Sequence, residues 1–434
     1  MKIGSSSTTG WRATISVAMS NYIEAGSIIA IATSLGFWQA RFGFDDLTAG
    51  LLAAFSANAF GAAIGAILGG PLSDRFGRKF IYTYDLIVFM VGVLLAAFAA
   101  NVTMLFLGFV LTGIAVGAGV PASWTYIAEQ APSKNRAKHV GTAQLAWSFG
   151  PLVGFALAAV LSPLGLFGSR LIFIHLFIVA AIVWWMRQGL PESKSWKDER
   201  DARTAGIPTV HGPNSAGLRG LFSKRVNLKA LLFLFGVYGF WGVVAGQAGI
   251  FMPRVYAAAG VESVVEQDLL QVLVWACTVI GTYFGFMQLA DRMSRRVLYT
   301  IGAVLGIAGW LALVFAPPGS VSLIVFAVTW GVASGIGAQA FYGLWTSELF
   351  ATPYRATAQG VLFFAARIAV GLLSYFFPVL LTGAGVGTVG LIMIALLAVA
   401  LVVGAVWTPN TRGRSLEEIE RERYNLPAVE EPVR

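Results

Sequence analysis

Twelve long apolar runs follow one another along the chain, and they constrain its fold more than any other feature. Each reaches about 20 residues, the length that an α-helix needs to cross the roughly 30 Å hydrocarbon core of a bilayer. Apolar residues make up 57% of the 434 residues, and the mean hydropathy is +0.74, which leaves too little polar surface for a soluble globule. We therefore expect an all-α integral membrane protein with 12 transmembrane helices, centred near residues 26, 59, 90, 116, 151, 178, 242, 277, 306, 335, 369 and 397.

One long polar segment divides these runs six and six. It is rich in charge, glycine and proline, and it extends from about residue 190 to 226. The sequence thus predicts an N-terminal six-helix bundle (1–189), a cytoplasmic linker (190–226), a C-terminal six-helix bundle (227–408) and a cytoplasmic tail (409–434).

The positive charge lies almost entirely in alternate connections. If both termini and every even-numbered connection are cytoplasmic, all but four of the 30 basic residues fall on that side. Arg41, Arg170 and Arg254 lie on the other side, and Arg367 lies within a span. This asymmetry predicts a multi-pass protein of the plasma (inner) membrane with both termini cytoplasmic. It accounts for the net charge of +9 without a nucleic-acid partner, since no basic face is interleaved with aromatic residues.

The two halves carry the same pattern at nearly constant spacing, which indicates an internal duplication of a six-helix unit. Residues of the first half recur 217 to 219 positions later, at the pairs Asp74 and Asp291, Gly113 and Gly331, Gly117 and Gly335, Gly119 and Gly337, Glu129 and Glu348, Arg136 and Arg355, and Gly141 and Gly360.

The stretch "GPLSDRFGRK", residues 70–79, is similar to the major facilitator superfamily signature G-x-L-a-D-r-x-G-r-k. The segments "LPESKSW" and "PNTRGRSLEEIE" resemble the sugar-porter and metabolite:proton-symporter branch of that superfamily. This resemblance implies the major facilitator fold, with two pseudo-symmetric six-helix bundles and alternating access. It implies a monomer in a lipid bilayer that needs no cofactor.

The charges of this stretch predict a cytoplasmic latch between the halves. Asp74 can pair with basic residues of its own loop and accept hydrogen bonds from a neighbouring helix N-terminus. In the alternative, Arg75, Arg78 and Lys79 only set the topology. The second copy is less complete, because Met287 and Ser294 replace glycines. The expected latch comprises Gly70, Asp74, Arg75, Gly77, Arg78, Lys79, Glu129, Arg136, Asp291, Arg292, Glu348 and Arg355.

Two ionisable residues stand in the middle of predicted spans, where charge is costly and therefore indicates function. Glu24 in span 1 occupies the position where symporters of the resembled branch carry an aspartate, so we expect it to couple transport to protons. Arg367 in span 11 offers a fork suited to a carboxylate substrate. The alternative for both is a structural ion pair between Glu24 and Arg367.

Polar and aromatic residues of several spans form the expected substrate wall. The resemblance is incomplete here, since Phe109 stands in place of the usual span-4 arginine, and Phe240 and Trp241 stand near the usual span-7 glutamines. The candidate substrate-binding residues are Gln144, Trp147, Ser148, Trp241, Gln247, Gln339, Tyr342 and Arg367.

The function expected from these residues is secondary active transport, as proton-coupled uptake of a small organic or sugar acid. A neutral sugar or polyol:proton symporter and a proton-coupled drug efflux antiporter are the alternatives, the latter because "SFGPLVG" partly matches an antiporter signature. With one cysteine, Cys277, and no paired catalytic carboxylates or phosphate loop, the sequence predicts no enzyme and no metal site.

Overall fold

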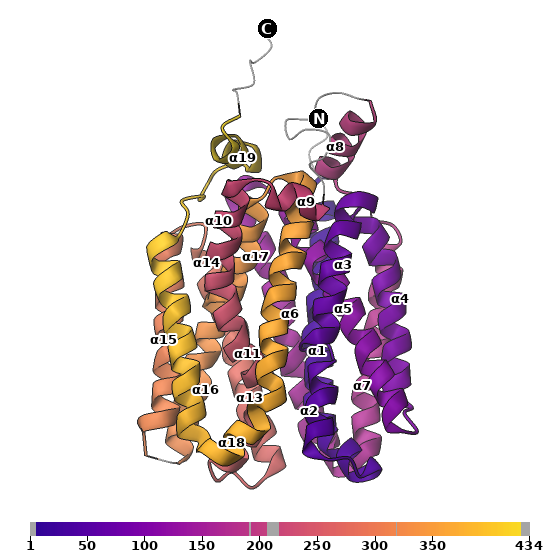
Figure 1. Cartoon of the computed structure of the whole chain (residues 1–434), viewed down its shortest axis with the longest axis vertical. Coiled ribbons are helices and arrows are strands. Elements are labelled where there is room, and N and C mark those ends of the chain that lie inside the picture. The colour runs from indigo at the N-terminus through magenta and orange to yellow at the C-terminus, as the bar shows by residue number, and fades with distance from the viewer. Residues whose placement is uncertain (1–5, 191, 206–216, 318, 427–434) are drawn as a thin grey trace.

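All regular elements of the described chain are helices, and most run nearly parallel to one long axis (Figure 1). The computed structural model describes residues 6–190, 192–205, 217–317 and 319–426. Parts of the predicted linker and tail, and the basic residues Lys2 and Arg434, therefore lie outside the described residues. The all-helical architecture agrees with the predicted fold class.

The helices of the first half gather on one side of the molecule (Figure 1). Side chains cap two of its helices, because Asp45 and Asn101 accept from the backbone N–H groups of Thr48 and Met104. The helices are α1 (Ser6–Phe42), α2 (Asp46–Ala54), α3 (Phe60–Phe76), α4 (Arg78–Ala97), α5 (Val102–Gln130), α6 (Arg136–Leu161) and α7 (Gly165–Arg187).

The helices of the second half lie beside them. Short π-helical turns at Phe235–Gly239 and Gly281–Phe286 interrupt two of the spans, and π-turns of this kind are frequent near functional sites. The helices are α10 (Arg225–Leu234), α11 (Phe240–Ile250), α12 (Met252–Ala258), α13 (Val264–Ile280), α14 (Met287–Leu289), α15 (Arg295–Phe315), α16 (Ser320–Ile336), α17 (Ala338–Leu349) and α18 (Arg355–Trp407).

Three short helices lie at one end of the bundle: α8 (Lys194–Thr204), α9 (Gly217–Phe222) and α19 (Leu416–Tyr424) (Figure 1). We call this end, which the charge pattern predicts to be cytoplasmic, the basic end. The connections at residues 43–45, 98–101 and 259–263, and residues 316–317, lie at the opposite end (Figure 1).

Nine segments of the described chain are long and apolar enough to cross a membrane. Two of them, residues 136–187 and 352–407, have 52 and 56 residues and turn back within their length. The turns fall at Ser162–Leu164 and at Gly385, whose φ of 77° is not helical. The helix α3 has 17 residues and is not among these nine segments. The number of 12 spans stays a prediction. The two turns divide each of the two long segments at a point between two of the predicted spans.

The second predicted span is interrupted rather than one continuous helix. Its predicted centre near residue 59 falls in a break between α2 and α3, where Ala59 has φ −143° and ψ −105°. Local polar groups favour the break, because the Ser56 hydroxyl donates to the carbonyl of Ala53 and accepts from the backbone N–H of Asn58. The break frees the carbonyl of Asn58 in the middle of the bundle.

The halves touch most closely near the basic end, where α3 packs against the start of α18. A Cβ on Gly70 would lie 2.7 Å from the carbonyl oxygen of Ala356, and one on Gly360 would lie 2.4 Å from that of Ala66. The two backbones therefore meet without side chains between them, and this contact closes the basic end of the molecule.

Candidate functional site

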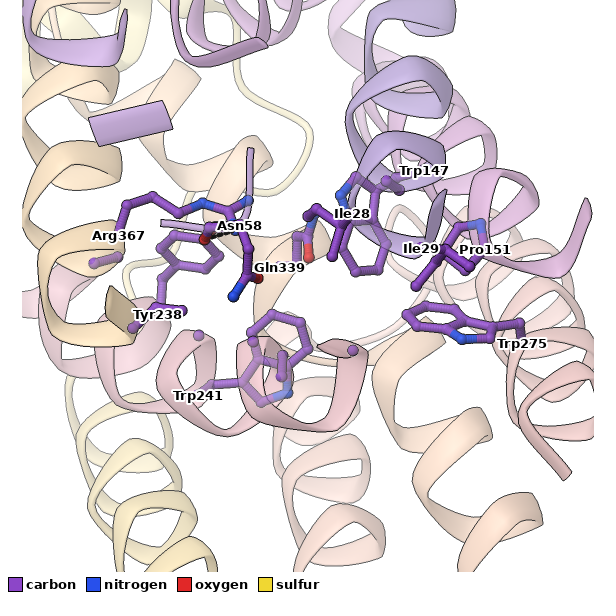
Figure 2. A pocket seen from close by; sticks show the side chains of 17 residues that line it. Ile28, Ile29, Asn58, Trp147, Pro151, Tyr238, Trp241, Trp275, Gln339 and Arg367 are labelled. Carbon is purple, nitrogen blue, oxygen red and sulfur yellow. Dashed lines mark hydrogen bonds between the residues drawn. The ribbon is translucent and has the colours of Figure 1, made fainter. Parts of the chain in front are cut away.

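A small pocket lies between the halves in the middle of the bundle (Figure 2). Its cavity of about 30 Å³ holds little more than water, so the helices are closed around it. Arg367, Asn58 and Tyr238 lie on one side of it, and Trp147, Pro151 and Trp275 lie on the other (Figure 2). Both halves thus contribute to one site.

The side chains of Glu24 on α1 and Arg367 on α18 form an ion pair between the halves at this pocket. The same guanidinium donates from Nη1 to the carbonyl oxygen of Asn58 at 2.8 Å and lies 4.5 Å from the ring centre of Phe363. Glu24 is fully buried and Arg367 is 6% exposed. Arg367 therefore holds together the broken span 2, span 1 and its own helix. The ion pair between Glu24 and Arg367 is the alternative that the sequence left open.

Three of the candidate substrate-binding residues line the pocket besides Arg367, namely Trp147, Trp241 and Gln339. The Trp147 ring packs edge-on against Trp275 at 5.2 Å between ring centres, and Trp241 stacks on Trp330 at 6.5 Å. Together they form an aromatic wall with an amide on it, which suits the face and hydroxyls of a small ring.

The other four candidates do not line the pocket. Gln247 donates to the carbonyl of Val370 and to Ser374, both on α18, so it serves packing between helices. The Tyr342 hydroxyl donates to the carbonyl of Gln359, and its ring stacks on Tyr238 at 4.0 Å behind the pocket wall. Gln144 and Ser148 are buried, and the Ser148 hydroxyl donates to the carbonyl of Gln144.

Asn58 and Trp275 line the pocket, and the sequence interpretation did not single out either. A signal for Asn58 was present, since "SANAF" places polar residues in the centre of an apolar run. Trp275 gave no such signal, because most aromatic residues in membrane spans face lipid or pack against neighbouring helices. Neither amide atom of Asn58 has a hydrogen-bond partner among the described residues, so this side chain is available to a ligand.

At the basic end, a first ion-pair network joins the halves through Asp74. Its Oδ2 accepts from the backbone N–H and the hydroxyl of Thr357, at 2.7 and 2.8 Å, in the first turn of α18. Its Oδ1 lies 3.1 Å from Arg78, which pairs with Glu129 at 2.9 Å. Glu129 reaches across to Arg355 at 3.0 Å. We call Asp74, Arg78, Glu129 and Arg355 the first network.

A second network repeats this geometry with the halves exchanged. Asp291 accepts from the backbone N–H groups of Ala137 and Lys138, at 3.4 and 3.2 Å, in the first turn of α6. Arg295 lies 3.5 Å from Asp291 and 2.7 Å from Glu348. Glu348 reaches across to Arg136 at 3.0 Å. Burial raises the pKa of the Asp291 carboxyl above its ordinary value, although Arg295 opposes this.

The basic residues of the predicted latch divide into two groups. Arg78, Arg136 and Arg355 are buried in ion pairs that join α3, α4, α5, α6, α17 and α18. Arg75, Lys79 and Arg292 are exposed and form no ion pair among the described residues, so their charge remains available only for topology. For Arg75 and Lys79 this arrangement is the one that the alternative expects, whereas for Arg78 it is not. Arg295, which the sequence interpretation omitted, takes the place expected of Arg292.

A bend at Gly77 joins the first network to the polar segment between the halves. Gly77 ends α3 with φ 100°, a conformation that favours glycine, and it starts α4. The two oxygens of Glu192 accept from the backbone N–H groups of Arg78 and Lys79, at 3.1 and 3.0 Å, and thus cap α4. The indole of Trp196 on α8 donates to the carbonyl of Asp74 at 2.8 Å.

Known proteins resemble this chain over nearly its whole length. It is 41% identical over 414 residues to the "Minor myo-inositol transporter IolF" of Bacillus subtilis, covering 95% of this chain and 94% of that protein. It is 26% identical over 379 residues to the "Cis,cis-muconate transport protein" of Acinetobacter baylyi, covering 84% and 86%. The solved structure of the proton:xylose symporter XylE bound to 6-bromo-6-deoxy-D-glucose superposes with a TM-score of 0.79 at 20% identity, covering 96% of this chain and all of that one.

The family assignment rests on sequence and fold together. Residues 13–372 match the sequence profile of the Major Facilitator Superfamily. The matched range includes the signature at residues 70–79, both ion-pair networks and the central pair of Glu24 and Arg367. The chain therefore belongs to the Major Facilitator Superfamily of membrane transporters and is not an enzyme.

Proposed function

We propose that the chain is a proton-coupled symporter that takes up a neutral sugar or polyol across the plasma membrane, with both termini cytoplasmic. The observation that carries this proposal is the ion pair between Glu24 and Arg367 in the central pocket. In the closed pocket Glu24 already compensates the charge of Arg367, so Arg367 does not need an anionic substrate as its partner there. The organic-acid reading of the sequence thereby loses its main support.

The remaining groups of the pocket suit hydroxyls. The two amide atoms of Asn58 and the indole N–H group of Trp275 have no hydrogen-bond partner among the described residues. Such groups donate to and accept from hydroxyls, and indole rings pack on the apolar face of a sugar or cyclitol ring. The similarity to a myo-inositol transporter supports the same substrate class.

Coupling follows from the partners of Arg367. While Glu24 is ionised, the pair draws α1 of one half to α18 of the other and holds the pocket closed. Protonation of Glu24 removes that attraction, so the halves separate more easily and the pocket widens for substrate. Release of the proton to the other side restores the pair. A proton thereby accompanies each substrate, and the carboxyl is buried enough to keep the two solutions apart.

An organic acid is the second candidate substrate. A guanidinium in the pocket and the similarity to a muconate transport protein favour it. An anion would have to displace Glu24 from Arg367, and the displaced carboxylate would then have to take up a proton. The two candidates therefore differ in how substrate charge and proton uptake are linked.

Counterflow in proteoliposomes tests the proposal. Liposomes loaded with unlabelled compound are diluted into tracer, with myo-inositol, glucose, xylose, glucuronate, muconate and a lipophilic cationic drug as the panel. We expect exchange of the polyol or sugars and little exchange of the acids. Exchange of glucuronate or muconate alone would favour the organic-acid reading, and exchange of the drug alone would favour efflux.

A further inference from the structure

We propose that a second polyol-binding subsite, with Asp268 as its main hydrogen-bond acceptor, lies between the halves at the end opposite the ion-pair networks. This inference rests on the proposed function, because it takes the substrate to be a neutral polyol or sugar. It assigns a role to a buried carboxylate that neither the latch nor the central pocket uses.

The subsite is a cavity of about 360 Å³, far larger than the central pocket. It is lined by α1, α6 and α7 of the first half and by α11, α12 and α13 of the second. Gly36 and Val264 on its border are exposed, so the cavity reaches the surface at the end opposite the networks. A small polyol fits here, whereas the closed central pocket holds little more than water.

Asp268 lies on the wall of this cavity, in the second turn of α13. It is 4% exposed, and among the described residues no hydrogen-bond donor and no charged group acts on its carboxyl. A buried carboxylate without donors is costly, so such a group normally has a function or a ligand. Donors brought in by a ligand would lower this cost.

The surroundings of Asp268 match a molecule with several hydroxyls. Arg254, Ser162, Ser169 and Thr33 line the same cavity, while Ile250, Phe251 and Ile172 supply apolar wall. A carboxylate with two oxygens accepts from two neighbouring hydroxyls of a ring, and the arginine donates to a third. The combination of one acidic acceptor, one cationic donor and an apolar wall recognises a vicinal diol on a compact ring.

The cavity continues the central pocket along the same helices. On α1, Ile28 and Ile29 line the central pocket, and Ala32, Thr33 and Gly36 line the outer cavity about one turn further on. On α11, Gly246 and Gly249 line the central pocket, and Ile250 follows in the outer cavity. The outer cavity thus begins about one helical turn from the central pocket, on the side where the halves are not joined by the networks.

The experiment measures entry and exit separately, with myo-inositol as the probe. In oriented vesicles, Asp268→Asn should raise the KM for uptake from the outside by about 10-fold or more, since it removes a charge-assisted hydrogen bond. The maximal rate of uptake and the KM for exit should stay within about twofold, because the central pocket is unchanged. Ser169→Ala should raise the entry KM in the same direction but less.

Glu262→Gln is the matched control, because it removes a negative charge from the same end at an exposed position outside the cavity. It should leave both KM values unchanged. Equal changes of entry and exit KM in Asp268→Asn, or an unchanged entry KM, would overturn the subsite. A thermal unfolding measurement on each variant distinguishes misfolding from a change in substrate binding. If Asp268→Asn does not fold, Ser169→Ala still decides the test.

Failure of the subsite and failure of the proposed function give different results. If the wild-type protein does not exchange myo-inositol, glucose or xylose at all, the proposed function is wrong and the subsite falls with it. If the wild-type protein exchanges one of them and Asp268→Asn keeps the same entry KM for that compound, only the subsite is wrong.

Discussion

The ion pairs at the basic end occur twice, whereas the ion pair at the centre occurs once. Asp74 and Asp291 each accept from the first turn of a helix of the other half, and the glutamates of both networks reach across to an arginine. The position 217 residues after Glu24 holds Trp241, and the position 219 residues before Arg367 holds Ser148. The central pair therefore has no symmetric counterpart.

This difference separates closing the basic end from coupling transport. Closing the end of a two-half bundle is a symmetric task, so both halves keep the same device. Binding a proton and a substrate is directional and needs one titratable group in one place. The two networks are also unequal, because the hydrogen bonds of Asp74 to its partner helix are shorter than those of Asp291, and Asp291 is more exposed.

The largest effect is expected at the centre, for Glu24→Gln. The neutral amide resembles the protonated carboxyl, so accumulation of substrate against its gradient should be lost while exchange continues. Uptake and counterflow in proteoliposomes with an imposed pH gradient measure the two activities. Full accumulation by this variant would show that Glu24 does not couple transport to protons. The central ion pair would then be structural, like the networks at the basic end.

The next largest effect is expected for the removal of Arg367, as a loss of thermal stability. Arg367→Gln leaves Glu24 buried without its cation and leaves the Asn58 carbonyl without its strongest donor. Loss of one partner of a buried ion pair typically costs about 3–5 kcal/mol. Thermal unfolding in detergent should show a lowered midpoint, and the double variant with Glu24→Gln should recover part of it. A single variant as stable as the wild type would contradict the pairing.

Within the basic end, we expect Asp74→Asn to shift the conformational equilibrium more than Asp291→Asn. Each carboxylate stabilises only the state in which the basic end is closed, by about 1–3 kcal/mol, and Asp74 makes the shorter contacts. Labelling of Ser347→Cys by an impermeant maleimide from the cytoplasmic side, in a Cys277→Ala background, measures the opening. Equal labelling of the two variants would remove the inequality between the networks.

The smallest effect is expected for the exposed basic residues. Arg75→Gln and Arg292→Gln should leave the labelling of Ser347→Cys unchanged, because neither side chain forms an ion pair in the part of the chain that the structure describes. Arg78→Gln, with two carboxylate partners, is the matched comparison at the same loop. An opening caused by Arg75→Gln as large as that caused by Arg78→Gln would return Arg75 to the latch.

Long-range periodicity made the fold predictable from sequence. Apolar runs of fixed length, basic residues in alternate connections and a repeat of about 218 residues each follow from the bilayer or from duplication. The break of span 2 was not predicted, because Ser56 and Asn58 interrupt an apolar run without glycine or proline. Their effect depends on hydrogen bonds within the turn and on the arginine of another helix.

The site was predictable only in part. Glu24 and Arg367 stand out because charges are rare inside spans, but their pairing depends on how two helices 343 residues apart meet. Gln144 was chosen because it matches a sugar-contacting glutamine, and Gln247 because it lies near the usual span-7 glutamines. Neither lines the pocket, and Gln247 donates to the carbonyl of Val370 on α18 instead. Arg295 was missed because three basic residues follow one another closely in "DRMSRR", and only the fold shows which one points inward.

The most direct test of the central claim is the proton flux that accompanies substrate entry. Proteoliposomes that contain a pH-sensitive dye receive myo-inositol outside, without an imposed gradient. We predict that the interior acidifies with the wild-type protein and does not acidify with Glu24→Gln, although that variant still exchanges labelled myo-inositol. Entry of myo-inositol through the wild-type protein without acidification, or equal acidification by Glu24→Gln, would contradict the claim that Glu24 couples transport to protons.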